Sequence, residues 1–148
     1  MKEEIINVKL LNDKAILPTY GSPFAAGADL YANIEEEIEI KPHETEFIKT
    51  GLSFEIPEGY AGLIYPRSGL SCKSGLAPAN KVGVIDSDYR GEIIVALHNH
   101  SKKAKIVSPN DRIAQIIFTP YIKGKFNIKN KLNDTVRGTG GFGSTGKN

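Results

Sequence analysis

Two stretches of the sequence carry groups that could bind an anion, and the first is the run Pro66-Arg67-Ser68-Gly69-Leu70. Arg67 supplies a guanidinium, Ser68 supplies a hydroxyl, and the small residues around them can open a helix. A guanidinium and a helix N-terminus both favour phosphate or carboxylate groups. A structural turn with an arginine salt bridge is the alternative, because the run alone does not distinguish the two.

The second stretch is the glycine-rich segment 137–146. Its glycines expose backbone N–H groups that can surround an anion, while Arg137, Ser144 and Thr145 add a cation and hydroxyl donors. Phe142 has no core to join, so it could stack on a planar ligand. A flexible tail is the alternative. The glycine spacing formally matches the dinucleotide-binding pattern, but the following helix that this pattern requires is not expected here. The segment also resembles a P-loop, but the lysine that should precede the hydroxyl residue is missing.

A third stretch, residues 80–93, combines apolar residues with carboxylates at a predicted turn. It reads as a strand over 83–85, a tight turn at Ser87-Asp88 and a second strand, which predicts a β-hairpin. A carboxylate at the end of a buried apolar strand is costly unless it is solvated or used, so Asp86 is a candidate general base. Ordinary turn chemistry is the alternative for Asp86, and it is preferred for Asp88.

Other polar residues give weaker signals. Asp29 and the run Asp111-Arg112-Ile113-Ala114-Gln115 could each belong to a structural ion pair. The three histidines have no metal-ligand spacing, and one cysteine cannot build a zinc site of the usual kinds, which excludes a zinc-dependent deaminase. The sequence also lacks the G-x-S-x-G pattern of a serine nucleophile.

Short strands must position these groups. Apolar and polar residues alternate in the runs 5–10, 37–40, 93–97 and 113–118. A turn signal recurs about every ten residues, which predicts an all-β sandwich or barrel. One helix of one or two turns is expected at 68–73, where Ser68 can cap the first turn.

The 148-residue chain is long enough for one domain, and its 40% hydrophobic residues are typical of a globular protein. The net charge of +2 is too small to indicate nucleic acid as a direct partner, although residues 119–148 hold six basic residues against one acidic residue. We expect a β domain over 1–122 and an arm over 123–148 that orders on a ligand. The single Cys72 and the charged N-terminus favour a cytoplasmic protein without a membrane segment.

Taken together and in this order, five segments resemble the five motifs of the homotrimeric dUTPase family. They are AGADLYA at 26–32, PRSGLS at 66–71, GVIDSDYRGEI at 83–93, DRIAQ at 111–115 and RGTGGFGSTG at 137–146. The resemblance implies a homotrimer of distorted jelly-roll β-barrels, each with one short helix and a flexible glycine-rich C-terminal arm, and active sites shared between subunits. It also implies hydrolysis of dUTP to dUMP and pyrophosphate with Mg²⁺, which limits uracil in DNA and supplies dUMP for dTMP synthesis.

The same resemblance implies roles for individual residues. Asp86 would activate the attacking water, Asn80 and Gly83 would read the uracil edge, Tyr89 would lie against the deoxyribose and Phe142 would stack on the base. The residues that would hold the phosphates are Arg67, Ser68, Gly69, Gln115, Arg137, Gly141, Ser144 and Thr145. Asp29 would orient water around a Mg²⁺ ion that the triphosphate holds, with no direct protein ligand, and Asp29 and Gln115 would join Asp86 in catalysis.

Two positions depart from the family pattern, because Asn110 stands where glycine is usual and Ser71 where alanine is common. Asparagine tolerates the left-handed backbone conformation, so neither departure is expected to alter function. Two other functions stay open. One is a dCTP deaminase or bifunctional dCTP deaminase–dUTPase of the same fold, which ammonia release from dCTP would reveal. The other is a nucleotide-responsive binding protein, which would bind dUTP without turning it over.

Overall fold

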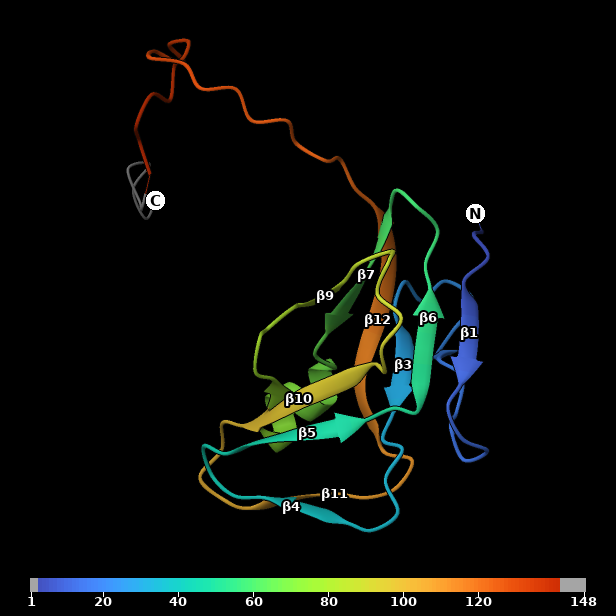
Figure 1. Cartoon of the computed structure of the whole chain (residues 1–148). Helices are drawn as coiled ribbons and strands as arrows, with labels where there is room; N and C mark the ends of the chain where they lie inside the picture. Colours follow the sequence, from blue (N-terminus) through green and yellow to red (C-terminus); the bar gives the residue numbers. More distant parts are fainter. Residues whose placement is uncertain (1–2, 142–148) are drawn as a thin grey trace.

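A five-stranded antiparallel sheet holds the centre of the fold. The computed structural model describes residues 3–141, and in this sheet the strand order is β2-β3-β12-β7-β9. The strands are β2 (Thr19–Tyr20), β3 (Ala28–Tyr31), β7 (Tyr60–Tyr65), β9 (Gly83–Ile85) and β12 (Arg112–Pro120). β12 lies between β3 and β7 (Figure 1) and therefore joins segments that are far apart in the sequence.

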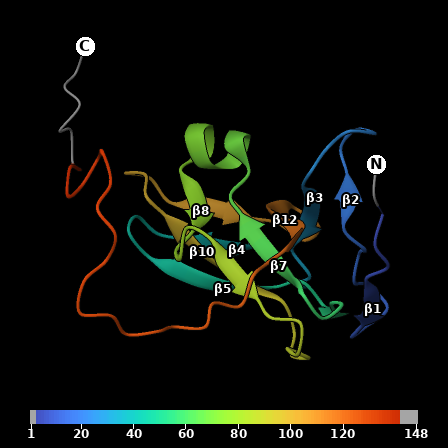
Figure 2. The ribbon, with the colours of Figure 1, turned by 90° about the horizontal axis from the view of Figure 1, so that it is seen from above.

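Three smaller antiparallel sheets complete the β-sheet part of the fold, from β1 to β12, which is called the strand body below and which Figure 2 shows from above. The order β5-β10-β8 joins β5 (Thr45–Lys49), β10 (Ile94–Asn99) and β8 (Leu76–Pro78). Two pairs are formed by β1 (Asn7–Leu10) with β6 (Leu52–Glu55) and by β4 (Ile38–Ile40) with β11 (Lys105–Val107). Both β8 and β10 approach β12, so the β5-β10-β8 sheet lies against the large one.

The core lies between these sheets because alternate strand residues point inward. In β3, Ala28 and Leu30 are at most 2% exposed, and in β10 the same holds for Val95 and Leu97. The rings of Phe54 and Phe118 meet edge to face with centroids 5.8 Å apart. The same alternation turns the side chain of Asp29, between two core residues of β3, away from the core.

The prediction of a mostly β chain with one short helix is confirmed. The four alternating runs coincide in whole or in part with β1, β4, β10 and β12. The helix differs in detail from the prediction, because its π-helical part, η1, spans Leu70–Ser74 and no side chain caps its start. The helix ends at Gly75, which has the left-handed conformation and whose N–H donates to the Leu70 carbonyl. Asn110 has φ of 66°, in the left-handed region that asparagine tolerates.

The predicted hairpin at 83–93 is wrong. β9 pairs with β7, whereas β10 pairs with β5 and β8, so the two strands belong to different sheets. The segment between them is a turn in which the N–H of Tyr89 donates to the Asp86 carbonyl at 3.2 Å. After this turn the chain enters the core at Ile93, which is 1% exposed and donates its N–H to the Leu52 carbonyl.

Beyond β12 the described chain leaves the strand body and contains neither helix nor strand up to Gly141 (Figures 1 and 2). From Ile122 onward its apolar side chains are largely exposed, and those of Phe126 and Ile128 almost fully so. The division into a domain over 1–122 and an arm over 123–148 stays a prediction. Among residues 3–141 there is no helix with the length and apolar character needed to cross a membrane.

Asn99 tests how the strand body is held together. It is fully buried, and its side-chain amide donates to the carbonyls of Ile40 and Lys103 at 2.8 Å while its oxygen accepts from Ser101. Asn99→Leu keeps the branched shape and the number of heavy atoms but removes these bonds, so we expect the free energy of unfolding in urea to fall by about 2–4 kcal/mol. Asn7→Leu, at an exposed bond to Glu55, should change it by less than about 0.5 kcal/mol. Equal losses in both variants would contradict this account.

Candidate functional site

The pairing of β3, β12 and β7 brings candidate residues from three sequence segments next to one another. Gln115 of β12 lies opposite Asp29 of β3 on one side and opposite Tyr65 of β7 on the other. Pro66 and Arg67 follow Tyr65 directly, so the sheet register brings Arg67 to the end of the row. An irregularity in the pairing between Arg112 and Ala114 lets β12 present Arg112 at the same end.

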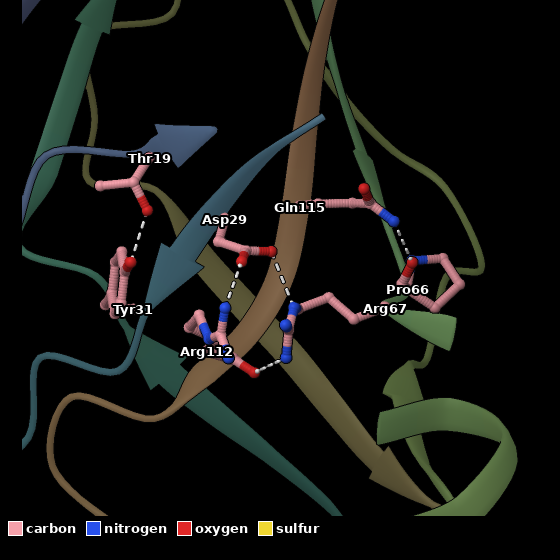
Figure 3. Close-up of polar contacts among 7 residues, drawn as sticks. All are labelled: Thr19, Asp29, Tyr31, Pro66, Arg67, Arg112 and Gln115. Carbon is pink, nitrogen blue, oxygen red and sulfur yellow. Dashed lines mark hydrogen bonds and ion pairs between the residues drawn. The ribbon is translucent and has the colours of Figure 1, made fainter. Parts of the chain in front are cut away.

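Asp29 accepts hydrogen bonds from two arginines (Figure 3). Its Oδ1 lies 2.7 Å from Nε of Arg67, and its Oδ2 lies 3.2 Å from Nη1 of Arg112. Nη1 of Arg67 also donates to the Arg112 carbonyl at 3.2 Å. Only 14% of the Asp29 side chain and 25% of the Arg67 side chain is exposed, so this ion pair is shielded from water. The expectation that Asp29 could belong to a structural ion pair is therefore confirmed.

Gln115 is positioned by two contacts. Its Nε2 donates to the Pro66 carbonyl at 2.9 Å, which ties β12 to the segment that carries Arg67 (Figure 3). Gly27 lies so close that a Cβ there would be 3.0 Å from Cδ of Gln115 and closer still to its Oε1. A side chain at position 27 would therefore displace the Gln115 amide.

Ser68 and Gly69 lie exposed immediately before η1. The N–H of Ser71 donates to the Arg67 carbonyl at 2.8 Å, so the backbone coils directly after the arginine. A ring nitrogen of His100 lies 3.1 Å from the Ser71 carbonyl and fastens this coil to the end of β10. Arg67, Ser68 and Gln115, which the sequence analysis assigned to phosphate binding, are thus neighbours in the structure.

A second group of candidate residues lies around β9. A Cβ on Gly83 would lie 3.2 Å from Nδ2 of Asn80, so these two residues are adjacent. Asp86 follows β9 and is exposed, and no described residue hydrogen-bonds its carboxylate. The argument that Asp86 ends a buried strand is wrong, because β9 is an edge strand and its Val84 is 62% exposed. Asp86 is a solvated carboxylate in this chain.

Asp86 of the second group does not approach Arg67 within one chain. β9 is antiparallel to β7, with Gly83 opposite Ile64 and Ile85 opposite Gly62. Asp86 therefore lies beyond Gly62, at the opposite end of the pairing from Arg67. The stretch from Gly62 to Arg67 spans roughly 16 Å at about 3.3 Å per residue.

The glycine-rich end is described only as far as Gly141. Arg137 donates from Nε to the Gly140 carbonyl at 2.9 Å, and the N–H of Gly140 donates back to the Arg137 carbonyl at 3.0 Å. Gly138 has φ of 53°, in the left-handed region that glycine adopts without steric cost. The remaining candidates of this segment, Phe142, Ser144 and Thr145, lie outside the described residues.

Sequence reasoning missed two residues that organise the site, Arg112 and Gly27. Both lie inside segments with recognisable motifs, but nothing in the sequence pattern indicates that Arg112 shares Asp29 with Arg67 or that Gly27 faces Gln115. The described residues contain no group of three or more histidine, cysteine or acidic side chains arranged to hold a metal ion. An arginine, a hydroxyl and an amide beside one another can hold a polyphosphate.

Comparison with known proteins agrees with this chemistry. A family model described as dUTPase matches residues 13–146. The deoxyuridine 5'-triphosphate nucleotidohydrolase of Desulfitobacterium hafniense is 50% identical over 131 residues, which cover 88% of this chain and 87% of that protein. The enzyme of the same name from Syntrophotalea carbinolica is 44% identical over 146 residues, 99% of each chain.

A solved structure of the Staphylococcus bacteriophage 80alpha dUTPase with dUPNHPP superposes with a TM-score of 0.84 at 27% identity, covering 97% of this chain and 99% of that one. The strand arrangement and the sequence thus point the same way. The chain belongs to the dUTPase family.

The shielded ion pair at Asp29 should contribute measurably to stability. Asp29→Asn removes the charge that Arg67 and Arg112 share, so we expect the free energy of unfolding to fall by about 1.5–3 kcal/mol. Glu35→Gln is the matched control, because Glu35 pairs with Lys14 at 3.3 Å with both side chains mostly exposed. It should cost less than about 0.5 kcal/mol. Urea titration measures both, and a loss at Asp29 no larger than that at Glu35 would refute the organising role of this pair.

Proposed function

We infer that this chain is a dUTP diphosphatase, which hydrolyses dUTP to dUMP and pyrophosphate. The observation that carries the inference is the match of the dUTPase family model to residues 13–146, together with relatives of that activity at 44–50% identity over most of the chain. Asp29, Arg67, Ser68 and Gln115, which the resemblance assigns to the substrate phosphates and the metal, lie together in the structure. Their grouping supports the assignment.

The proposed architecture is a homotrimer of jelly-roll subunits with shared active sites. The separation of Asp86 from Arg67 within one chain supports sharing, since the base and the phosphate-binding groups must act on one substrate. The exposed apolar side chains beyond β12 support a segment that packs against another copy, and they are Ile122, Phe126, Ile128, Leu132 and Val136. In this proposal residues 123–148 form the arm that closes a neighbour's site.

The proposed chemistry is a single displacement at the α-phosphorus. The Asp86 carboxylate accepts a proton from a water whose oxygen forms the new bond to phosphorus, and the bond from phosphorus to the α,β-bridging oxygen breaks. Pyrophosphate leaves with that bond's electron pair. Arg67 and Gln115 hold the phosphate chain, and Ser68 lies near the bridging oxygen where charge develops. Gly69 offers its backbone at the same place.

The remaining candidates recognise the nucleoside and close the site. Asn80 and Gly83 read the uracil edge, which their adjacency supports, and Tyr89 lies against the deoxyribose. Phe142 stacks on the base. The outer phosphates are held by Arg137, Gly141, Ser144 and Thr145.

Mg²⁺ is the proposed cofactor, and the donor set around Asp29 fits an ion that the triphosphate carries. A carboxylate has about four lone-pair positions, so Asp29 can accept from metal-bound water while both arginines remain bonded. The ion would neutralise phosphate charge when bound. In this proposal Asp29 orients its water and contributes no direct ligand.

The direct test is release of pyrophosphate and ammonia from dUTP, dTTP, dCTP and UTP. We expect pyrophosphate from dUTP in large preference to the other three nucleotides, and no ammonia. Ammonia from dCTP would instead indicate a deaminase, and tight binding of dUTP without product would indicate a nucleotide-responsive binding protein.

Asp86→Asn should abolish turnover while leaving dUTP bound, because an amide keeps the shape but cannot take the proton of water. We expect kcat to fall by at least about a hundredfold with little change in the Kd for dUTP. Asp88→Asn is the matched control, because Asp88 lies in the same exposed turn and should retain activity. Turnover by Asp86→Asn within tenfold of the parent would show that Asp86 is not the base.

A further inference from the structure

Gly91 supports the ring of Tyr89 in the turn between β9 and β10. A Cβ built on Gly91 would lie 2.5 Å from Cζ and 2.9 Å from Cε2 of Tyr89, and closer still to the hydroxyl oxygen. The three atoms nearest to that Cβ all belong to Tyr89. The bare Cα of Gly91 is therefore the surface on which this ring lies.

The ring is also held at both ends. The Tyr89 hydroxyl donates to the Glu92 carbonyl at 3.1 Å, and the backbone N–H of Tyr89 donates to the Asp86 carbonyl at 3.2 Å. Yet 44% of Tyr89 remains exposed. A ring that is ordered without being buried presents a defined face to a ligand.

The rest of the turn is fastened to the strand body. Nη1 of Arg90 donates to the carbonyls of Ser87 and Tyr89 at 2.7 and 3.1 Å. The Ser53 hydroxyl donates to the Arg90 carbonyl at 2.7 Å, and the N–H of Gly51 donates to the Glu92 carboxylate at 3.0 Å. The backbone around Gly91 is thus braced, and the Tyr89 ring is the part that can yield.

Glycine at position 91 is not required by the backbone. Positive φ occurs at four described glycines, and Gly91 is not among them. An alanine at this position therefore meets no positive-φ strain, and the atoms nearest to its methyl group belong to the Tyr89 ring. Substitution here acts on Tyr89 with little other disturbance.

We propose that Gly91 is a positioning residue that sets discrimination between deoxyribonucleotides and ribonucleotides, because it lets the Tyr89 ring lie where a ribose 2′-hydroxyl would fall. The inference rests on the proposed function, in which Tyr89 faces the sugar. An added methyl group at position 91 moves the ring, and the space for a 2′-hydroxyl opens.

The test is a double-mutant cycle in which the measured quantity is substrate specificity and not the rate with one substrate. The ratio of kcat/KM for dUTP to that for UTP is measured by pyrophosphate release for the parent, Gly91→Ala, Tyr89→Ala and the double variant. We expect each single variant to lower the ratio at least about tenfold, and Gly91→Ala to have no further effect when Tyr89 is absent. Discrimination between dUTP and dCTP, which Tyr89 does not govern, should remain within about threefold of the parent in every variant.

Gly21→Ala is the control glycine, because nothing lies within 4 Å of its Cβ position and its φ is not positive. It should leave both ratios unchanged. Tyr89→Phe gives a second measurement in which Gly91 is left unchanged. It removes the bond to the Glu92 carbonyl and should lower the dUTP-to-UTP ratio by less than Tyr89→Ala does.

The outcomes separate the two levels of the argument. If Tyr89→Ala leaves the ratio unchanged, the proposed sugar contact is wrong and the role of Gly91 falls with it. If Tyr89→Ala lowers the ratio but Gly91→Ala does not, the sugar contact stands and the role of Gly91 is overturned. A loss that persists when Gly91→Ala is combined with Tyr89→Ala would also overturn it. Should Gly91→Ala fail to fold, an unchanged ratio in Tyr89→Phe would contradict the positioning of the ring.

Discussion

The carboxylate of Asp29 is the group on which the arrangement of the candidate site depends. It is largely shielded from water, so its charge would be costly without partners, and Arg67 and Arg112 supply them. Arg67 donates from Nε to the Asp29 carboxylate and from Nη1 to the Arg112 carbonyl. Its guanidinium plane is therefore fixed, and a fixed guanidinium binds phosphate with less loss of side-chain entropy than a free one.

The register of the five-stranded sheet sets a second constraint. The same pairing of β3, β12 and β7 that collects Asp29, Gln115 and Arg67 sends β9 in the opposite direction along β7. Asp86 is carried to the far end as a result. In the proposed reaction, a second copy of the chain therefore brings its Asp86 to the phosphate-binding groups of the first.

Several features of this arrangement could be predicted from the sequence. Alternating runs identified β1, β4, β10 and β12 because one face of each strand is buried and the pattern has period two. The hairpin prediction failed because alternation and turn residues indicate where a strand ends but not with which other strand it pairs. At Gly83–Ile85 the neighbour is β7, about twenty residues earlier in the chain.

The site shows the same division between local and long-range information. Arg67, Ser68 and Gln115 carry recognisable chemistry in their own segments, so sequence motifs could single them out. Arg112 contacts Asp29, which is 83 positions away in the chain, and Gly27 lies against Gln115, which is 88 positions away. No local sequence pattern encodes contacts over such separations. The exposure of Asp86 was also missed, because an apolar run does not reveal that its strand lies at a sheet edge.

The central claim is that one active site takes Asp86 and Arg67 from different chains. Mixed trimers of Asp86→Asn and Arg67→Gln, prepared by co-refolding equal amounts and assayed for dUTP hydrolysis, test it most directly. Each variant alone should be nearly inactive, whereas random mixing should restore about a quarter of the sites, because that fraction pairs an intact Asp86 from one chain with an intact Arg67 from another. Mixed trimers that form and remain inactive would contradict the claim, since both residues of a site would then come from the same chain.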